Sequence, residues 1–228
     1  MESKLTTCTR RGFLQLGLGL AAGAPLALSS GCGTGDQHSA PPPRSDAKVA
    51  IVSCKTYGAS ELQGAISQVF TLLGGIGALV NGKIVTVKIN LTSDGSYENL
   101  FGLPPGDSFI TNGATAIALA SLLLSQGAQK VRFVDSAPFR EGLDQVLTLA
   151  GWDVTTLLAL GNVELENTRN LGSGSAYAKL NVPDGGYLFS YFELNHCYAD
   201  TDVFISLAKL KQHLTAGVTL SMKNVFGA

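Results

Sequence analysis

The sequence predicts an α/β fold in which a mostly parallel sheet is flanked by helices and carries an antiparallel hairpin insertion. Between residues 48 and 150, short β-branched or apolar runs alternate with longer apolar runs of helical period, as in repeated strand–helix units. Two alternating runs in residues 177–191 flank the turn sequence Pro-Asp-Gly-Gly, which predicts a hairpin. With 228 residues, 45% of them hydrophobic, the chain can form one globular domain with additional end segments.

The first strand–helix unit is expected at residues 48–70. Residues 48–52 form a compact apolar run that predicts a strand, and residues 60–63 have the spacing of a capping box that opens a helix. The β-branched run 84–90 predicts the next strand. Residues 91–110 are rich in Gly, Ser, Asp and Pro and predict a loop long enough to have a function.

The remaining elements follow in the same alternating order. Asn112 is a suitable cap for an Ala- and Leu-rich helix that ends before Gly127, and residues 130–134 predict a strand. A helix is expected at residues 140–150 and an extended segment at residues 153–160. After the hairpin, another strand is expected at residues 202–207.

Residues 1–32 predict a twin-arginine export signal. Thr9 precedes Arg10 and Arg11, and an apolar run over residues 13–28 follows that is shorter and more Gly-rich than the about 20 apolar residues of a membrane span. Small residues precede Cys32 as in a lipobox, although Ser29 stands where such motifs usually have Leu. Either Cys32 is acylated or the signal is cleaved within residues 27–31.

The export signal predicts the location of the protein and its binding partners. Residues 33–47 contain three consecutive prolines and no apolar period, which predicts a flexible tether in front of a domain over residues 48–228. We expect an exported protein that is periplasmic or lipid-anchored to the outer face of a membrane. Its expected partners are the twin-arginine translocase and, if Cys32 is acylated, the membrane.

Charge and cysteine content exclude several classes of function. Sixteen Lys and Arg against seventeen Asp and Glu leave no basic excess, so no nucleic-acid partner is expected. The four cysteines form no Cys-x-x-Cys pair, so neither an iron–sulfur cluster nor another metal site is expected. Cys54 and Cys197 either pair or remain free thiols, and His196 is expected to be structural.

Polar side chains at predicted strand ends form the candidate site, because open α/β sheets bind ligands beyond the carboxyl ends of their strands. Lys88 and Asn90 are two residues apart and share one side of a strand, and Asp135 and Ser136 directly follow another. A lysine in a strand covered by helices is costly unless it is paired or binds an anion. Alternatively, Lys88 extends to solvent and Asp135 caps a turn.

A second group of cationic residues lies near the end of the chain. Lys209, Lys211 and His213 alternate and would share one face of an extended segment, and Lys223 and Asn224 follow after a loop. Such a cluster suits a carboxylate- or phosphate-bearing ligand. The alternatives are a solvated strand edge for the lysines and a structural role for the histidine.

Three segments in this order resemble the domain-of-unknown-function 362 family: residues 87–91, residues 127–136, and an ending with Leu-Lys-Gln-His at 210–213 and Thr-Leu-Ser-Met-Lys-Asn-Val-Phe-Gly at 219–227. The resemblance covers residues 48–228 and implies no generally established activity. Some family members carry an iron–sulfur module that this sequence lacks. Family domains continue past the Asn-x-Phe-Gly motif, which implies that this chain ends inside the domain. The shared motifs favour a site role for Lys88, Asn90, Lys211, His213, Lys223 and Asn224.

These observations predict an enzyme acting on a small anionic ligand, with the reaction and the cofactor left open. His213 would act as acid or base and Asp135 would assist it. The alternatives are a surface-tethered protein that binds the anion without catalysis and an inactive truncated remnant. The ligand-binding residues would be Lys88, Asn90, Ser136, Lys209, Lys211, Lys223 and Asn224.

Overall fold

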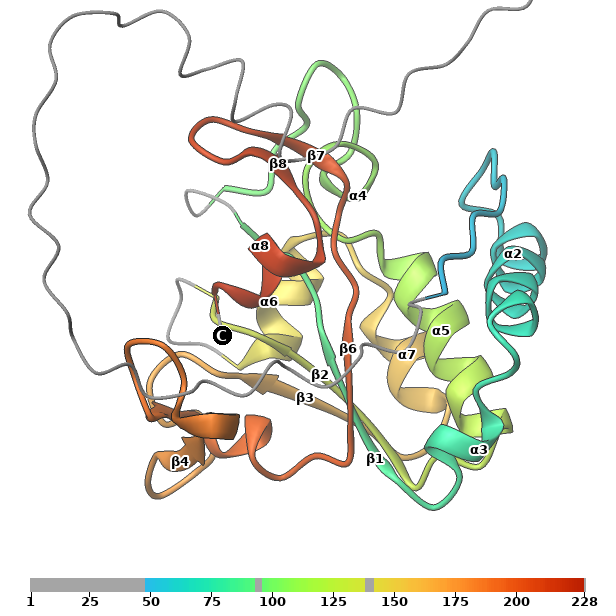
Figure 1. Ribbon diagram of the computed structural model, residues 1–228. Helices are drawn as coiled ribbons and strands as arrows, with labels where there is room; N and C mark the ends of the chain where they lie inside the picture. The colour runs from blue at the N-terminus through green and yellow to red at the C-terminus, as the bar shows by residue number, and fades with distance from the viewer. Residues whose placement is uncertain (1–47, 93–95, 138–141, 228) are drawn as a thin grey trace, which may run out of the picture. The chain divides into compact units, whose positions relative to one another are not determined.

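The computed structural model describes residues 48–92, 96–137 and 142–227 (Figure 1). The predicted signal at 1–32, the tether at 33–47 and Cys32 lie outside the described residues, as does the expected helix start at Arg140. None of the helices in the described ranges is long and apolar enough to cross a membrane.

The predicted α/β class is confirmed by a four-stranded parallel sheet at the centre of the fold (Figure 1). Its strand order is β3-β2-β1-β6, and each neighbouring pair runs parallel. The two central strands are the β-branched runs that the sequence pattern predicts. The bounds are β1 (Ile84–Lys88), β2 (Lys130–Asp135), β3 (Val163–Asn167) and β6 (Val203–Ser206).

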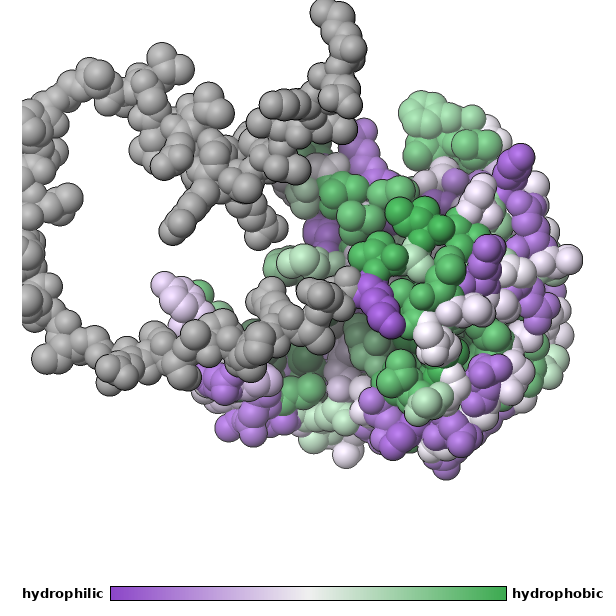
Figure 2. All heavy atoms as spheres, turned by 45° about the vertical axis from the view of Figure 1, so that its right-hand side comes forward, coloured by the Kyte–Doolittle hydropathy of each residue, from purple (hydrophilic) through white to green (hydrophobic). Residues whose placement is uncertain are grey.

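Helices cover one face of this sheet and form the main hydrophobic core with it. Val85 and Val87 of β1 and Val131 and Phe133 of β2 are fully buried in this core, as the alternation of side chains along a strand requires. The helices that contribute core side chains are α2 (Ala59–Leu72), α3 (Gly77–Val80), α5 (Gly113–Ser125), α6 (Leu143–Leu149) and α7 (Val154–Ala159). Figure 2 shows hydrophobic residues gathered on the side of the molecule where helices lie, with hydrophilic residues around them.

The opposite face of the sheet carries polar and charged side chains together with a small apolar cluster of Val134, Cys197 and Tyr198. Strand register places Thr86 of β1 beside Arg132 of β2, and Arg132 beside Glu164 of β3. Arg132 is 2% exposed and forms ion pairs with Glu164 at 3.2 Å and with Asp200 at 3.1 Å. This side of the sheet therefore buries the charge of Arg132, which two more exposed carboxylates compensate, as burial of charge requires.

Smaller elements complete the fold around the sheet. The predicted hairpin is confirmed as an antiparallel pair, β4 and β5, joined through the turn element η1. A second antiparallel pair, β7 and β8, precedes the last helix, α8. The bounds are α4 (Pro105–Ser108), β4 (Ala178–Asn181), η1 (Pro183–Gly185), β5 (Tyr191–Leu194), η2 (His196–Tyr198), β7 (Lys211–His213), β8 (Gly217–Thr219) and α8 (Ser221–Val225).

The prediction of a strand at residues 48–52 is wrong. Val49 is 83% exposed and Ile51 is 89% exposed, and the segment pairs with no strand of the described chain. An apolar run becomes a strand only where a neighbour completes its hydrogen bonds; both sides of β1 are taken by β2 and β6, and residues 48–52 pair with neither edge strand, β3 or β6.

The predicted extended segment at residues 153–160 is helix α7 instead. The Asp153 carboxylate accepts hydrogen bonds from Thr156 N at 2.9 Å and from Thr156 Oγ1 at 2.6 Å, which caps the helix start. Leu157 then points into the core and is fully buried. Val154 and Thr155 are β-branched, a type that favours strands, but the capping bonds and this burial favour a helix.

The predicted capping box at residues 60–63 does not form, although the helix itself is confirmed. Helix α2 begins at Ala59 without a side-chain cap, so Ser60 lies inside its first turn. Glu61 instead accepts hydrogen bonds from Lys55 N at 2.6 Å and Thr56 Oγ1 at 2.5 Å. These bonds tie the preceding segment to the start of the helix.

Candidate functional site

A pocket of about 340 Å³ lies at the carboxyl ends of β1 and β2. Lys88, the last residue of β1, is in register with Val134, so the two strands end side by side and their following residues converge. The pocket combines strand ends with the C-terminal elements β7, β8 and α8. Its lining comprises Lys88, Asn90, Leu91, Thr92, Asp135, Ser136, Arg169, His213, Thr219, Lys223, Asn224, Phe226 and Gly227.

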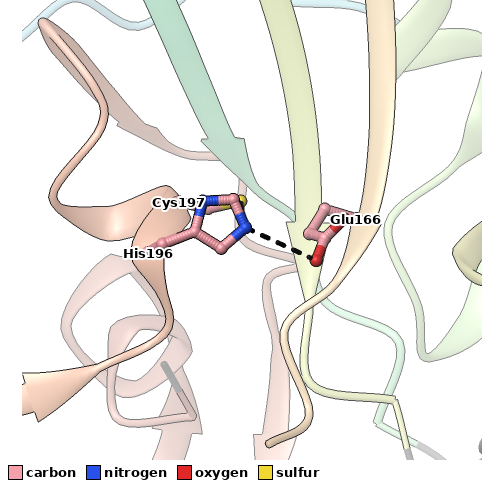
Figure 3. A group of neighbouring side chains, drawn as sticks. All are labelled: Glu166, His196 and Cys197. Carbon is pink, nitrogen blue, oxygen red and sulfur yellow. Dashed lines mark hydrogen bonds and ion pairs between the residues drawn. The ribbon is translucent and has the colours of Figure 1, made fainter. Parts of the chain in front are cut away.

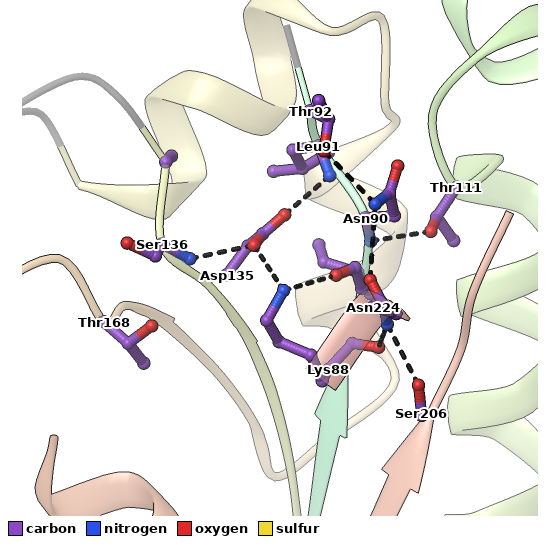
Figure 4. A network of polar contacts seen from close by, with 12 residues as sticks. Lys88, Asn90, Leu91, Thr92, Thr111, Asp135, Ser136, Thr168, Ser206 and Asn224 are labelled. Atoms are coloured by element: carbon purple, nitrogen blue, oxygen red, sulfur yellow. Dashed lines mark hydrogen bonds and ion pairs between the residues drawn. The ribbon is translucent and has the colours of Figure 1, made fainter. Parts of the chain in front are cut away.

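A buried ion pair forms the floor of this site (Figure 4). Lys88 Nζ lies 2.6 Å from Asp135 Oδ1 and donates a second bond to the carbonyl of Ile89 at 2.9 Å. The Asp135 carboxylate also accepts from Leu91 N at 2.6 Å and from Ser136 N at 2.8 Å. Asp135 therefore holds together the ends of both strands, and the charge of Lys88 is compensated inside the protein.

Two asparagines connect this floor to the C-terminal helix (Figure 4). Asn224 of α8 donates to the carbonyl of Lys88 at 3.0 Å and to Ser206 Oγ at 3.1 Å, and accepts from Asn90 Nδ2 at 3.3 Å. Asn224 is 3% exposed, so α8 is fixed against the ends of β1 and β6. The buried oxygen atoms Asn90 Oδ1 and Thr219 Oγ1 have no hydrogen-bond partner among the described residues.

His213 lines the pocket with a defined tautomer. Its Nδ1 atom accepts hydrogen bonds from the backbone N–H groups of Thr215 at 3.2 Å and Ala216 at 3.1 Å. A neutral imidazole that accepts at Nδ1 carries its proton on Nε2. This assignment follows from the bonding pattern, and it makes the remaining nitrogen of His213 a donor.

Lys223 is the lysine of the lining that is not compensated by a described carboxylate. It comes from α8, and no ion pair joins it to another residue in the part of the chain that the structure describes. Its ammonium group lies 5.4 Å from the centroid of the Phe226 ring, a weak cation–π contact. Lys223 thus brings a positive charge to the pocket that remains available to a ligand.

Lys211 and Lys209 lie outside the lining of this pocket. Lys211 Nζ donates to the carbonyl of Phe109 at 2.6 Å. Burial lowers the pKa of Lys211 below 10.5; Asp135 opposes this shift, and the charges of Lys223 and Lys209 add to it. Lys209 Nζ donates instead to Tyr57 Oη at 2.9 Å and to the carbonyl of Gly106 at 2.7 Å, beside a separate pocket.

The structure thus brings seven of the nine predicted site residues around one pocket. The seven are Lys88, Asn90, Asp135, Ser136, His213, Lys223 and Asn224. Sequence reasoning missed Arg169 and Thr219, which also line it. Arg169 follows the end of β3, so a correct prediction of that strand would have identified it in the same way as Asp135 and Ser136.

The two described cysteines do not form the disulfide that the sequence left open. Cys54 is exposed, Cys197 is buried, and both are free.

Comparison with known proteins connects this site to a family. Residues 85–228 match the model of a family described as a domain of unknown function, DUF362. The chain is 28% identical over 180 residues to a thylakoid-associated protein of Synechocystis sp., and the match covers 78% of this chain and 50% of the relative. The chain therefore spans half the length of this curated relative. No solved structure matches the chain. Since the family model covers the sheet, the pocket and the C-terminal elements, the chain belongs to the domain-of-unknown-function 362 family.

Proposed function

We propose that this protein binds a small carboxylate- or phosphate-bearing ligand in the pocket formed by β1, β2, β7, β8 and α8. One observation carries the proposal. Among the described lining residues the only carboxylate is Asp135, and it already accepts bonds from Lys88, Leu91 and Ser136. An anion entering the pocket therefore meets donors and positive charge rather than an available carboxylate.

Two donors are placed to hold such an anion. Lys223 contributes an ammonium group, and His213 contributes its Nε2–H because Nδ1 is occupied by backbone N–H groups. Charge-assisted hydrogen bonds of this kind are stronger than neutral ones, which favours carboxylates and phosphates over neutral ligands.

A catalytic role is the second candidate, and the buried Lys88–Asp135 pair favours it. The two side chains are 3% and 10% exposed, and a pair this buried costs stability unless something else repays it. In the catalytic proposal, Asp135 holds Lys88 in place, and His213 Nε2–H stabilises negative charge on the reacting ligand or supplies a proton to it.

The binding proposal is tested by thermal unfolding of the full chain with a panel of carboxylated and phosphorylated metabolites. A ligand that binds the folded state raises the unfolding temperature, and the rise grows with the logarithm of the ligand concentration relative to Kd once the site is largely filled. We expect at least one anion to stabilise the wild-type chain and a neutral analogue of the same size to have no effect. A folded protein that no anion stabilises contradicts the proposal and favours the inactive alternative.

The catalytic candidate needs a separate readout. Mass spectrometry of the stabilising anion after incubation with the protein would show whether it is converted. For catalysis, His213→Gln should retain binding within about tenfold while conversion stops. Unchanged conversion in this variant, or no conversion by the wild type, contradicts the catalytic role and leaves a binding protein.

We further propose that residues 1–32 direct export through the twin-arginine translocase and that Cys32 carries the lipid anchor. The Synechocystis relative is named for its association with thylakoids, which supports a location at a membrane. In cells with this translocase, changing Arg10 and Arg11 to lysine should leave the precursor inside. Labelled palmitate should enter the wild type but not Cys32→Ser. Export of the lysine variant, or equal labelling of both chains, would contradict these two parts.

A further inference from the structure

A second cluster of chemically capable side chains lies apart from this pocket, on the polar side of the sheet. It consists of Glu166, His196 and Cys197 (Figure 3). Glu166 belongs to β3, while His196 and Cys197 are adjacent residues of η2. Glu166 is 6% exposed and Cys197 is fully buried, so two of the three potential ligands are removed from solvent.

The donor atoms of the three side chains converge. His196 Nε2 lies 3.9 Å from Glu166 Oε1 and 3.7 Å from Cys197 Sγ, and all three donor atoms lie within 4.8 Å of one another. Zinc bonds of about 2.0 Å to oxygen or nitrogen and about 2.3 Å to sulfur place tetrahedral ligand atoms about 3.3–3.5 Å apart. Small side-chain movements therefore bring this cluster into a metal-binding geometry.

The surrounding chain holds these ligands in position. The Asn195 side chain accepts from Cys197 N at 3.0 Å and so caps η2. The N–H of Ser173 donates to Glu166 Oε1 and so orients this carboxylate, whereas Ser173 Oγ, 3.2 Å from His196 Nε2, holds the nitrogen that a metal would take over. Such outer contacts orient metal ligands.

Two glycines let the chain pass directly over the cluster. A side chain at Gly172 would meet Glu166 Oε1, and one at Gly174 would meet the ring of His196. Gly172 also has φ of +55°, a backbone conformation that other residues rarely adopt. The segment that carries Ser173 is therefore built to lie close to Glu166 and His196.

A nucleophilic triad is the other arrangement that a Cys, a His and a Glu can form. The Cys197 thiol is fully buried. A nucleophilic cysteine must be reached by its substrate, and reactive cysteines are partly exposed. The burial of Cys197 thus disfavours a nucleophile, whereas cysteine sulfur is a common zinc ligand.

We propose that Glu166, His196 and Cys197 bind one divalent cation of the zinc type, with a fourth position open to solvent or substrate. Mixed sulfur, nitrogen and oxygen donors suit zinc rather than calcium or magnesium, which prefer oxygen ligands. Glu166 and Ser173 line an adjacent cavity of about 560 Å³, from which the fourth ligand reaches the metal. This site does not depend on the anion pocket.

The sequence predicted no metal site because it contains no Cys-x-x-Cys pair. The cluster contains one cysteine, and its carboxylate comes from a strand that the sequence pattern did not reveal. Only the fold brings Glu166 to the adjacent pair in η2.

Cobalt(II) is a direct probe of this site, because a thiolate ligand gives it a near-ultraviolet charge-transfer band. The full chain is treated with a chelator and titrated with cobalt, then with zinc in competition. We expect the band to saturate at one cobalt per chain, to be absent in Cys197→Ser, and to persist in Cys54→Ser, which removes the exposed cysteine. Cys8 and Cys32 are present in every variant and do not affect this comparison.

Two further variants test the other ligands. Glu166→Gln keeps an oxygen to accept from Ser173 N, and His196→Gln replaces a side chain that is 30% exposed, so both should fold, as circular dichroism would confirm. Loss of an outer contact alone weakens metal binding about tenfold, so each of these variants should weaken zinc binding by at least that factor. His213→Gln, in the other pocket, should leave zinc affinity unchanged. Absence of the band in the wild type, its survival in Cys197→Ser, or unchanged affinity in folded Glu166→Gln and His196→Gln would overturn the proposal.

Discussion

Lys88 is a charged residue that is only 2% exposed, at the end of a central strand, so it needs a partner of opposite charge. It remains there because Asp135 lies 2.6 Å away, and because Asp135 has further donors in Leu91 N and Ser136 N. In a buried ion pair, either charged side chain destabilises the folded protein when the other is removed. The pair therefore fixes the floor of the pocket and links the two strand ends.

Breaking this pair tests its structural role. Lys88→Met should lower the free energy of unfolding by about 3–5 kcal/mol, and Asp135→Asn should do the same, because each leaves one buried group without its partner. The double variant should cost clearly less than the sum of the two, because neither charge then remains uncompensated. Denaturant unfolding of the four chains measures the coupling. Additive effects would show that the pair is not energetically linked.

Lys211 should make stability depend on pH. Its folded-state pKa is lowered by burial below 10.5, so between the lowered value and 10.5 the unfolded chain binds more protons at this residue than the folded chain does. The free energy of unfolding contributed by Lys211 therefore rises with pH through that window. Lys211→Gln keeps N–H donors for the Phe109 carbonyl and should remove this part of the rise.

Denaturant unfolding at a series of alkaline pH values checks this expectation. Lys55→Gln, at an exposed lysine, is the matched control and should follow the wild type. Equal slopes for Lys211→Gln and the wild type would mean that Lys211 is not desolvated.

At the scale of elements, the central strands and long helices were predictable because their side-chain periods were clear. Strand β1 and helix α5 follow the β-branched and Ala/Leu-rich runs, and Asn112 caps α5 as expected by accepting from Ala114 N at 2.9 Å. Strand β3 was missed because Glu164 and Glu166 interrupt its apolar pattern. The partner that compensates Glu164, Arg132 at 3.2 Å, lies on another strand and is distant in sequence.

The cap of α7 is the element-scale feature that can be tested. Asp153→Ala should lower the unfolding temperature of the protein, because two bonds to Thr156 at the helix start are lost. Asp153→Asn should retain most of the stability, since Asn caps helices nearly as well as Asp. Thermal unfolding of both variants measures the difference. An alanine variant as stable as the wild type would show that packing of Leu157 alone holds this helix.

At the scale of the whole molecule, the sheet separates an apolar face covered by helices from a polar face with buried charges. The location of the pocket was predictable, because parallel strands converge at their carboxyl ends and Lys88, Asn90, Asp135 and Ser136 follow them. The sequence could not predict that Lys209 lies outside the pocket, because its position depends on contacts with Tyr57 and Gly106, more than a hundred residues earlier in the chain. Alternation along the chain indicates a shared face, but not which cavity that face borders.

Comparing two lysines tests whether this pocket binds an anion. Inorganic phosphate and acetate serve as probes, titrated calorimetrically into the full chain, into Lys223→Met and into Lys209→Met. Lys223 lines the pocket and Lys209 does not. We expect at least one probe to bind, with affinity unchanged in Lys209→Met and at least about tenfold weaker in Lys223→Met, as loss of one charge-assisted bond implies. Equal affinity in the two folded variants, or no binding of either probe, would contradict anion binding at this pocket.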